Sequence, residues 1–334
     1  KRIRQLIVIA IIFAAIVYGF ISSRNNEQHF AWPLATCSSG ETVTNVFAQT
    51  FADYVSELSD GRMKIQVYTD STLGTDLELM ESMKDGDIPF IVASPSPQVS
   101  YIPQLCVFDT PCVYTDINTF RKNMENEELM DEFRKIYKEH GYRFLGITDQ
   151  GFRVMTSNKD VYTANDLKGQ KIRTMENPYH LLFWKSLGAN PTPMTFSEVY
   201  IGLQQGTIDA QENPYEVIVS NKFYEVQNYV VETNHLPHLL ALVTGNDFYN
   251  SLEPEQQAII DEAADIAKEY AREQAVERSE SRIQEIVSGG GDPSKAAEIV
   301  TISDDLRAQM REKSSGLYEQ IRKVVDDDDL FYTY

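Results

Sequence analysis

The most constraining feature of this chain is an alternation of strand-like and helix-like segments near its beginning. Residues 30–36 resemble a strand, 44–58 carry apolar residues at a helical period, and 63–68 alternate as a half-buried strand does. A helix is expected over 77–84 and a buried strand over 88–93. Strand, helix and strand in succession begin a βαβ unit, so the pattern predicts an α/β fold.

Length and charge narrow the function classes. The 334 residues are enough for two α/β lobes, and 42% hydrophobic residues exclude wholesale disorder. The formal net charge of −20 argues against nucleic acid or an anionic membrane surface as a partner, because either requires a basic face. An anionic ligand is still compatible with it, because charges on the outer surface are screened over about 8 Å at physiological salt.

The first residues predict export from the cytoplasm. A basic start, Lys1 to Arg4, precedes the apolar run 6–21, as in a secretory signal peptide or a signal anchor covering 1–28. Phe20 to Ser23 is a weak cleavage site, so an uncleaved membrane tether stays open beside a cleaved signal. Either alternative predicts a periplasmic or extracytoplasmic protein.

The central segment 151–214 carries two arginines in short strand-like runs, Arg153 in GFRVMTS and Arg173 in QKIRTM. Turn residues at 165–169 predict that the two strands are neighbours and that both guanidiniums face one crevice. A buried guanidinium requires an anion, and a carboxylate fits its planar fork. From the residues alone, an internal ion pair with an acid such as Glu212 is the commoner case, and a bound carboxylate is the alternative.

A polar strand end follows these arginines. Residues 189–194 read as a strand, a helix opens at Ser197 and stops at Gly206, and a short strand ends in Gln211 to Pro214. Asn213 at that end is able to donate to a ligand oxygen. The alternative is an Asx turn before the proline.

Four segments together resemble the solute receptors of tripartite ATP-independent periplasmic (TRAP) transporters, the DctP-like family. They are LGTDLELMESMKDGD at 73–87, RVMTSNKDVYTANDLKGQKIR at 153–173, LGANPTPMTFSEVYIGLQQGTIDAQENP at 187–214 and YEVQNYVVETNH at 224–235, in the family's order. The resemblance implies a two-lobed, type II periplasmic-binding-protein-like fold with a central cleft, hinge strands and a long C-terminal helix that spans both lobes.

The resemblance also implies a domain organisation. Lobe I is expected over 29–150 with 236–278, and lobe II over 151–235 with 279–334. The chain should cross between the lobes near Gln150 and Asn234, which makes a hinge.

The ligand site is implied residue by residue. Arg173 falls where the family pairs an arginine with the ligand carboxylate, and Arg153 and Asn213 fall on assisting positions. Glu212 and Asp76 join the candidate set, Asp76 because it opens a helix whose N-terminus faces the cleft in related receptors. Further candidates are Ser94, His235, Phe152 and Tyr215. Some sialic-acid receptors carry an acid near the position of Ser94, so its absence here puts that ligand in doubt.

No cofactor, metal or catalytic apparatus is expected. Cys37, Cys106 and Cys112 allow at most one bridge; Cys106 and Cys112 are the candidate pair, although buried thiols are the commoner case. His235 and His238 are separated by a proline and lack a third ligand. The chain has no GxSxG, GxxxxGK[ST] or HExxH motif.

The sequence therefore predicts a monomeric, extracytoplasmic solute-binding receptor. It would capture a small organic acid, with a mild preference for a sugar acid such as a hexuronate or hexonate, and deliver it to the membrane permease subunits of a TRAP transporter. A membrane-tethered ligand-sensing domain and a periplasmic enzyme acting on an organic acid are the alternatives.

Overall fold

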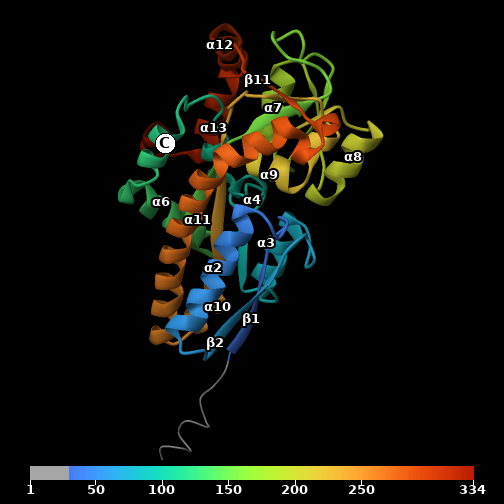
Figure 1. The fold of residues 1–334 in the computed structure, drawn as a ribbon. Helices are drawn as coiled ribbons and strands as arrows, with labels where there is room; N and C mark the ends of the chain where they lie inside the picture. Colours follow the sequence, from blue (N-terminus) through green and yellow to red (C-terminus); the bar gives the residue numbers. More distant parts are fainter. Residues whose placement is uncertain (1–29) are drawn as a thin grey trace, which may run out of the picture.

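Two β-sheets form the framework of the protein, which we describe from a computed structural model covering residues 30–334 (Figure 1). The predicted leader, 1–28, lies outside the described residues. Among residues 30–334, no helix has the length and apolar character needed to cross a membrane.

The first sheet has five strands in the order β2-β1-β3-β10-β4, and we call the part built on it lobe I. Its strands are β1 (Phe30–Ala35), β2 (Met63–Tyr68), β3 (Phe90–Ala93), β4 (Tyr142–Phe152) and β10 (Pro237–Gly245). Strands β2 and β3 each pair parallel to β1, as expected of βαβ connections. The connections are α2 (Val43–Leu58) and α3 (Asp76–Asp85), which confirms the predicted opening of the fold.

Local capping explains where these helices begin and end. The side chain of Thr42 accepts from the backbone N–H of Asn45 at the start of α2. Thr75 and Glu78 form a capping box at the start of α3, and Gly86 ends that helix in the left-handed conformation at φ 87°. The start of α3 lies beside the end of β1, since Sγ of Cys37 donates to the carbonyl of Gly74 at 3.4 Å.

The second sheet has six strands in the order β11-β9-β5-β8-β6-β7, and we call the part built on it lobe II. Its strands are β5 (Val154–Ser157), β6 (Lys171–Thr174), β7 (Asn190–Pro193), β8 (Ala210–Asn213), β9 (Tyr229–Val231) and β11 (Glu298–Val300). The expectation that the strands of Arg153 and Arg173 are neighbours is wrong, because β8 lies between β5 and β6. The turn after Ser157 carries the chain across β8 instead of closing a hairpin.

The remaining helices cover the two sheets (Figure 1). In lobe I and the connecting region they are α4 (Pro95–Gln98), η1 (Pro103–Asp109), α5 (Ile117–Asn123), α6 (Glu127–Glu139) and α10 (Asn246–Ser251). Those of lobe II are α7 (Pro178–Ser186), η2 (Phe196–Glu198), α8 (Val199–Gln205), α9 (Tyr215–Ser220) and η3 (Phe223–Glu225). The C-terminal part forms η4 (Gly289–Gly291), η5 (Pro293–Lys295), α12 (Asp304–Lys313), α13 (Ser315–Val325) and α14 (Asp328–Thr333).

Two helical segments are each divided into shorter helices. The segment 117–140 breaks after α5 because Asn126 caps a new helix, accepting from the backbone N–H groups of Glu128 and Leu129. The segment 303–325 breaks at Ser314 into α12 and α13.

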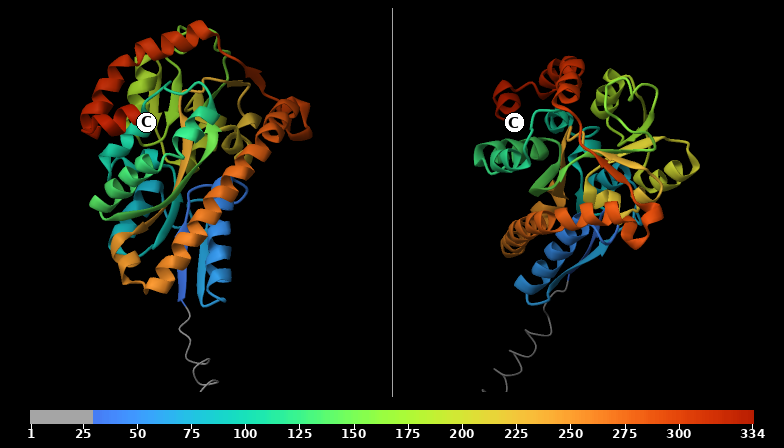
Figure 2. Two further views of the ribbon diagram at one scale, coloured as in Figure 1. Left: turned by 90° about the vertical axis from the view of Figure 1, so that its left-hand side faces the viewer. Right: turned by 45° about the horizontal axis from the view of Figure 1, so that its top comes forward.

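One long helix, α11 (Pro254–Ser288), runs along both lobes (Figures 1 and 2). It packs on α2 and β4 in lobe I, and on α9 and β11 in lobe II. Its 35 residues span about 50 Å at about 1.5 Å per residue. The two sheets and this spanning helix confirm the predicted fold class.

The chain crosses between the lobes where β4 leads into β5 and where β9 leads into β10. The crossings lie side by side, since the backbone N–H of Arg153 donates to the carbonyl of Leu236 at 2.8 Å. Gly151 and Asn234 have positive φ angles of 83° and 43° at these points. The residue boundaries given above for the lobes stay a prediction, and so does hinge motion.

The C-terminal helices contact both lobes, α13 packing against η1 and α7.

The end of α11 gives a test of this fold. Gly289 caps the helix at φ 64°, and a Cβ there would lie 2.7 Å from the backbone nitrogen of Ala296. We expect Gly289→Ala to lower the free energy of unfolding by about 2–4 kcal/mol, of which about 1–2 is the left-handed backbone cost and the rest is the clash. The control is Gly86→Ala, which has φ 87° and no atom within 4 Å. Chemical denaturation should show the larger loss at Gly289; equal losses would contradict the close packing.

Candidate ligand-binding site

A small cavity lies between the lobes at the ends of the central strands. It is lined by Thr36, Cys37, Ser38, Thr44, Asp76, Ala93, Ser94, Arg173, Met175, Phe196, Asn213, Val217, His238 and Leu240. Its volume of about 40 Å³ equals the space of about three water molecules. The structure thus brings together four of the predicted site residues, which are Arg173, Asn213, Asp76 and Ser94.

Arg173, on β6, supplies the positive charge of the cavity wall. Its side chain is buried, and Nε and Nη2 donate to the carbonyl of Met194 at 3.0 and 2.7 Å. Nη1 is buried and has no partner among residues 30–334. Burial lowers the pKa of Arg173 to about 10, with Arg153 adding to the effect and Glu212 opposing it. The guanidinium therefore stays charged at neutral pH and keeps its Nη1–Nη2 edge for an anion.

Asn213 ends β8 beside this edge. Its Oδ1 accepts from Nη2 of Arg153 at 3.2 Å, and its Nδ2 donates to Oε1 of Gln211 at 2.6 Å. These contacts, rather than an Asx turn before Pro214, hold the side chain. Asn213 therefore belongs to the cavity wall, with part of its hydrogen-bonding capacity used inside the protein.

Arg153 is paired internally, unlike Arg173. Its Nε contacts Oε2 of Glu212, and its Nη2 donates to Oε1 of the same carboxylate at 2.9 Å. Both side chains are fully buried and neither lines the cavity. Burial alone would raise the pKa of Glu212, but Arg153 and hydrogen bonds from His180 and His235 hold that pKa well below its ordinary value. The internal ion pair considered from the sequence thus describes Arg153.

Two histidines, His235 and His180, contact the carboxylate of Glu212. Nε2 of His235 lies 3.1 Å from Oε2 of Glu212, and its ring stacks on Phe183 at a centroid distance of 5.2 Å. Burial lowers the pKa of His235. His235 does not line the cavity, and its predicted ligand contact stays a prediction.

His180, on α7, is a residue that the sequence analysis missed. Its Nδ1 lies 3.4 Å from Oε1 of Glu212 and its Nε2 lies 3.0 Å from Oδ1 of Asp109 in η1. Burial opposes protonation, yet the hydrogen bonds to Asp109 and Glu212 raise the pKa of His180. A buried histidine in the apolar helix PYHLLFW was the available signal. This imidazole links η1 to β8 and so joins the two lobes.

His238 also lines the cavity, although in the sequence it was considered only for a metal site with His235, which was not expected. The two rings have different partners, because His235 contacts Glu212 whereas Nδ1 of His238 contacts Nη1 of Arg153. Burial, followed by the charge of Arg153, holds the pKa of His238 well below its ordinary value. Across residues 30–334, no three His, Cys, Asp or Glu side chains form a group that would hold a metal ion.

The opposite wall of the cavity, from lobe I, is acidic and hydroxylic. Asp76 lies in the first turn of α3, where burial raises its pKa and a hydrogen bond from Cys37 opposes that rise. Ser94 caps α4 by accepting from the backbone N–H of Ser96 at 3.3 Å.

Cys37, Cys106 and Cys112 are buried free thiols, so the Cys106–Cys112 bridge does not form.

Phe152 and Tyr215 lie elsewhere. Both line a separate pocket on the hinge side of the molecule, next to residues of α11. The hydroxyl of Tyr215 donates to Oε1 of Glu232 at 2.8 Å there. The structure therefore does not bring these two aromatic residues to Arg173; the aromatic ring of the cavity is Phe196.

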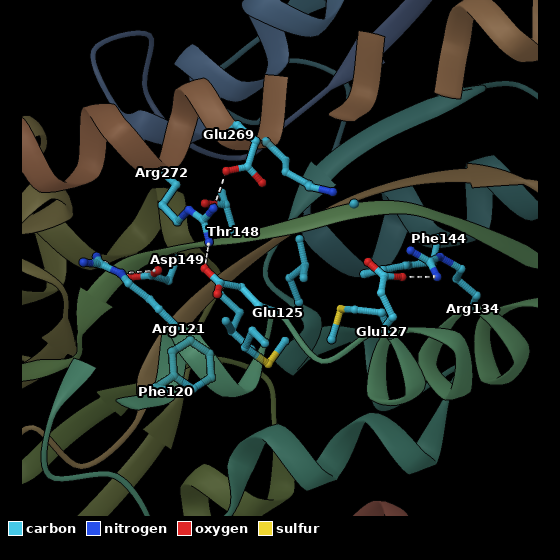
Figure 3. A pocket seen from close by; sticks show the side chains of 16 residues that line it. Phe120, Arg121, Glu125, Glu127, Arg134, Phe144, Thr148, Asp149, Glu269 and Arg272 are labelled. Atoms are coloured by element: carbon cyan, nitrogen blue, oxygen red, sulfur yellow. Dashed lines mark hydrogen bonds and ion pairs between the residues drawn. The ribbon is translucent and has the colours of Figure 1, made fainter. Parts of the chain in front are cut away.

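A further cavity of about 150 Å³ lies between β4, α5, α6 and α11 (Figure 3). Its charged side chains compensate one another: Arg121 pairs with Asp149 at 2.8 Å, and Arg272 pairs with Glu125 at 3.2 Å and with Glu269. Arg134 pairs with Glu127 at 3.1 Å. Because these cations already have anions, the cavity at Arg173 is the better candidate for binding an acid.

Two lobes, a spanning helix and a charged cavity between the lobes define a solute-binding protein. The model of the family "Bacterial extracellular solute-binding protein, family 7" (DctP) matches residues 34–323. The chain belongs to this family of TRAP-transporter solute-binding proteins.

Among curated proteins, the chain is 33% identical to the ectoine-binding periplasmic protein TeaA of Halomonas elongata, over 85% of this chain and 82% of that protein. It is 29% identical to the 2,3-diketo-L-gulonate-binding periplasmic protein YiaO of Escherichia coli K12, over 88% and 85%. A sugar acid binding protein from Advenella mimigardefordensis, solved with galactonate, is 25% identical with a TM-score of 0.85, covering 92% of this chain and 98% of that one. A TRAP solute-binding protein from Sulfurospirillum deleyianum, solved with succinate, is 28% identical with a TM-score of 0.85 over 91% and 98%.

The buried pair of Arg153 and Glu212 gives a stability prediction. Glu212→Gln keeps the shape but leaves a buried guanidinium without its anion, so we expect a loss of about 3–5 kcal/mol at pH 7. Because the folded pKa of Glu212 is depressed, its stabilisation is present above the ordinary value of 4.5 and is lost as pH falls through the folded pKa. The difference between variant and wild type should therefore shrink in acid, as followed by denaturant unfolding.

The control for this experiment is Glu132→Gln, which removes the carboxylate of an exposed pair with Lys135. We expect it to unfold near the wild-type denaturant concentration. Equal losses of unfolding free energy for the two variants would show that burial does not increase the contribution of the Arg153–Glu212 pair to stability.

Proposed function

We propose that this protein captures a small organic acid outside the cytoplasm and delivers it to the membrane permease subunits of a TRAP transporter. The observation that carries the proposal is the buried, unpartnered Nη1 of Arg173 in the cavity between the lobes. A carboxylate there would meet the Nη1–Nη2 edge in bidentate fashion, because only Nε–H and one Nη2–H are directed to Met194.

The contributions of Arg153 and Asn213 to the same carboxylate stay a prediction. Both residues direct donors to protein groups in this structure, Arg153 to Glu212 and Asn213 to Gln211. Arg173 is therefore the residue on which the proposal rests.

A sugar acid fits the rest of the cavity best. Asp76 is an acceptor for ligand hydroxyls, and Ser38, Ser94 and Thr44 both donate and accept. A dicarboxylate would bring a second negative charge, and Arg173 is the one cation that lines the cavity within residues 30–334. Three similar proteins were solved with galactonate, galacturonate and D-erythronate, which supports the preference; others were solved with succinate.

Capture requires movement. The cavity of about 40 Å³ is smaller than the about 150 Å³ that accommodates benzene in another protein. A hexonate therefore enters only if the lobes separate, and the two adjacent crossings at Gly151 and Asn234 are the proposed hinge.

Two other functions fit the chain less well. A membrane tether through the leader would suit a ligand-sensing domain, and the mature N-terminus measured by mass spectrometry would distinguish a tether from a cleaved signal. An enzyme acting on an organic acid has no support among the relatives, which are transport receptors. Turnover of a bound acid would favour it.

The direct test is substitution of Arg173. Removing one partner of a desolvated charge pair costs about 2–5 kcal/mol, so Arg173→Ala should weaken acid binding by roughly 30-fold to several thousand-fold. Arg173→Lys should recover only part of the affinity, because it keeps a charge but not the planar fork. The acid is first found by a thermal-shift screen of organic and sugar acids, in which saturation at a hundred times Kd adds about 2.7 kcal/mol. Isothermal titration then measures the variants, and wild-type affinity in folded Arg173→Ala would refute the proposal.

Closure is tested separately by small-angle scattering. We expect the radius of gyration to fall when the acid identified in the screen is added at saturation, because ligand favours the arrangement in which both walls contact it. Arg173→Ala at the same acid concentration is the control, and its radius should fall less than that of wild type because a smaller fraction of the variant is loaded. An unchanged wild-type radius would contradict a hinge between the lobes.

A further inference from the structure

His238 lines the ligand cavity with an imidazole ring of which one nitrogen has a hydrogen-bond partner in the protein. The residue lies on β10, is 7% exposed and lines the cavity together with Arg173 and Asn213. Its Nδ1 contacts Nη1 of Arg153. No hydrogen bond joins its Nε2 to any residue in the described range 30–334. One nitrogen is therefore held by the protein and the other is left for the cavity.

The contact with Arg153 fixes which nitrogen carries the proton. A guanidinium has only donors, so Nδ1 of His238 must accept and cannot carry a hydrogen. An imidazolium would place an N–H against the N–H of Arg153. In a neutral ring with Nδ1 unprotonated, the hydrogen is on Nε2. Burial and the charge of Arg153 hold the pKa of His238 well below its ordinary value, which agrees with this geometry.

We propose that His238 is a ligand-binding residue that donates from Nε2–H to an oxygen of the acid held by Arg173, and that Arg153 is the positioning residue that fixes this tautomer. The inference rests on the proposed function. It gives Arg153 an indirect role: Glu212 holds the guanidinium, the guanidinium holds Nδ1, and the opposite edge of the ring faces the ligand.

The charge of this arrangement defines the ligand class further. His238 contributes a donor without a positive charge, so the cavity wall holds one cation, Arg173, and one acidic group, Asp76. One ligand carboxylate is matched by Arg173, whereas a second one would find no cation. A monocarboxylic acid with hydroxyl or oxo oxygens uses the neutral donor fully, and we assign the site to that class in preference to dicarboxylates.

The experiment compares two variants with probes of each class. His238→Asn keeps a side-chain oxygen for Arg153 but is too short to replace Nε2, whereas His238→Leu removes both interactions. Titration calorimetry uses sodium D-galactonate, sodium D-galacturonate and disodium succinate. We expect His238→Asn to bind the two sugar acids about 3- to 10-fold more weakly than wild type, with a melting temperature above that of His238→Leu. His140→Asn, at the end of α6 and outside the cavity, is the control and should bind as wild type does.

A readout without ligand checks the positioning role. Long-range ¹H–¹⁵N spectra of the ligand-free protein at pH 7 should show His238 neutral with its hydrogen on Nε2, and Arg153→Lys should loosen this preference. A hydrogen on Nδ1, or an imidazolium, would overturn the tautomer assignment. Wild-type affinity in His238→Asn would overturn the ligand contact, and succinate binding as tight as D-galactonate binding would overturn the ligand class.

The experiments distinguish a failure of this inference from a failure of the proposed function. If Arg173→Ala binds the acids as wild type does, the carboxylate site fails while the His238 variants still decide the His238 contact. If none of the three acids binds wild type, the proposed ligand class has failed, and the spectra alone decide whether Arg153 sets the tautomer.

Discussion

The buried pair of Arg153 and Glu212 is the interaction on which the centre of this protein depends. Removing two charges from water costs several kcal/mol per ion, and the pair offsets this only because further groups satisfy both side chains. Glu212 also contacts His180 and His235, and Arg153 also contacts Asn213 and His238. A hydrophobic pair of similar volume would fill the same space. The ion pair is therefore better understood as the element that orients the cavity wall.

The contrast between the two arginines follows from sheet order. Val154 pairs with Asn213 and Arg173 pairs with Gln211, so the two arginines approach β8 from opposite sides. Glu212 lies between those two paired positions and its carboxylate is directed to Arg153. Arg173 donates to the carbonyl of Met194, lies over the ring of Phe196, and feels the charges of Glu212 and Asp76 without a direct ion pair. The side of β8 on which each arginine lies thus separates the arginine that is paired with Glu212 from the one whose Nη1 has no partner among residues 30–334.

Much of this was accessible from the sequence, for reasons that differ between elements. The strands β1 to β3 and the helices α2 and α3 follow from periodicity and capping, and the family resemblance implied the long helix α11. The family motifs predicted Arg173, Asn213 and Asp76 as site residues. Periodicity does not give strand order, so the position of β8 between β5 and β6 was missed. The position of β8 also decides whether Arg153 contacts the carboxylate of Glu212 or a ligand. Phe152, at a lobe crossing, and Tyr215, at the start of α9, line another pocket, because the direction of each side chain depends on backbone angles that turn residues do not specify. Their contact with a ligand stays a prediction. His238 was missed because its role comes from Arg153, which is distant in sequence.

The free edge of Arg173 would link binding to closure if the lobes move at the proposed hinge. In this structure Nη1 is buried and has no hydrogen-bond partner among residues 30–334, and the residues that line the cavity come from both lobes. A ligand carboxylate at that edge would contact both walls only while the lobes are together, so binding would stabilise that arrangement relative to a more open one. A receptor built this way would present the arrangement with the lobes together to a permease mainly when it is loaded.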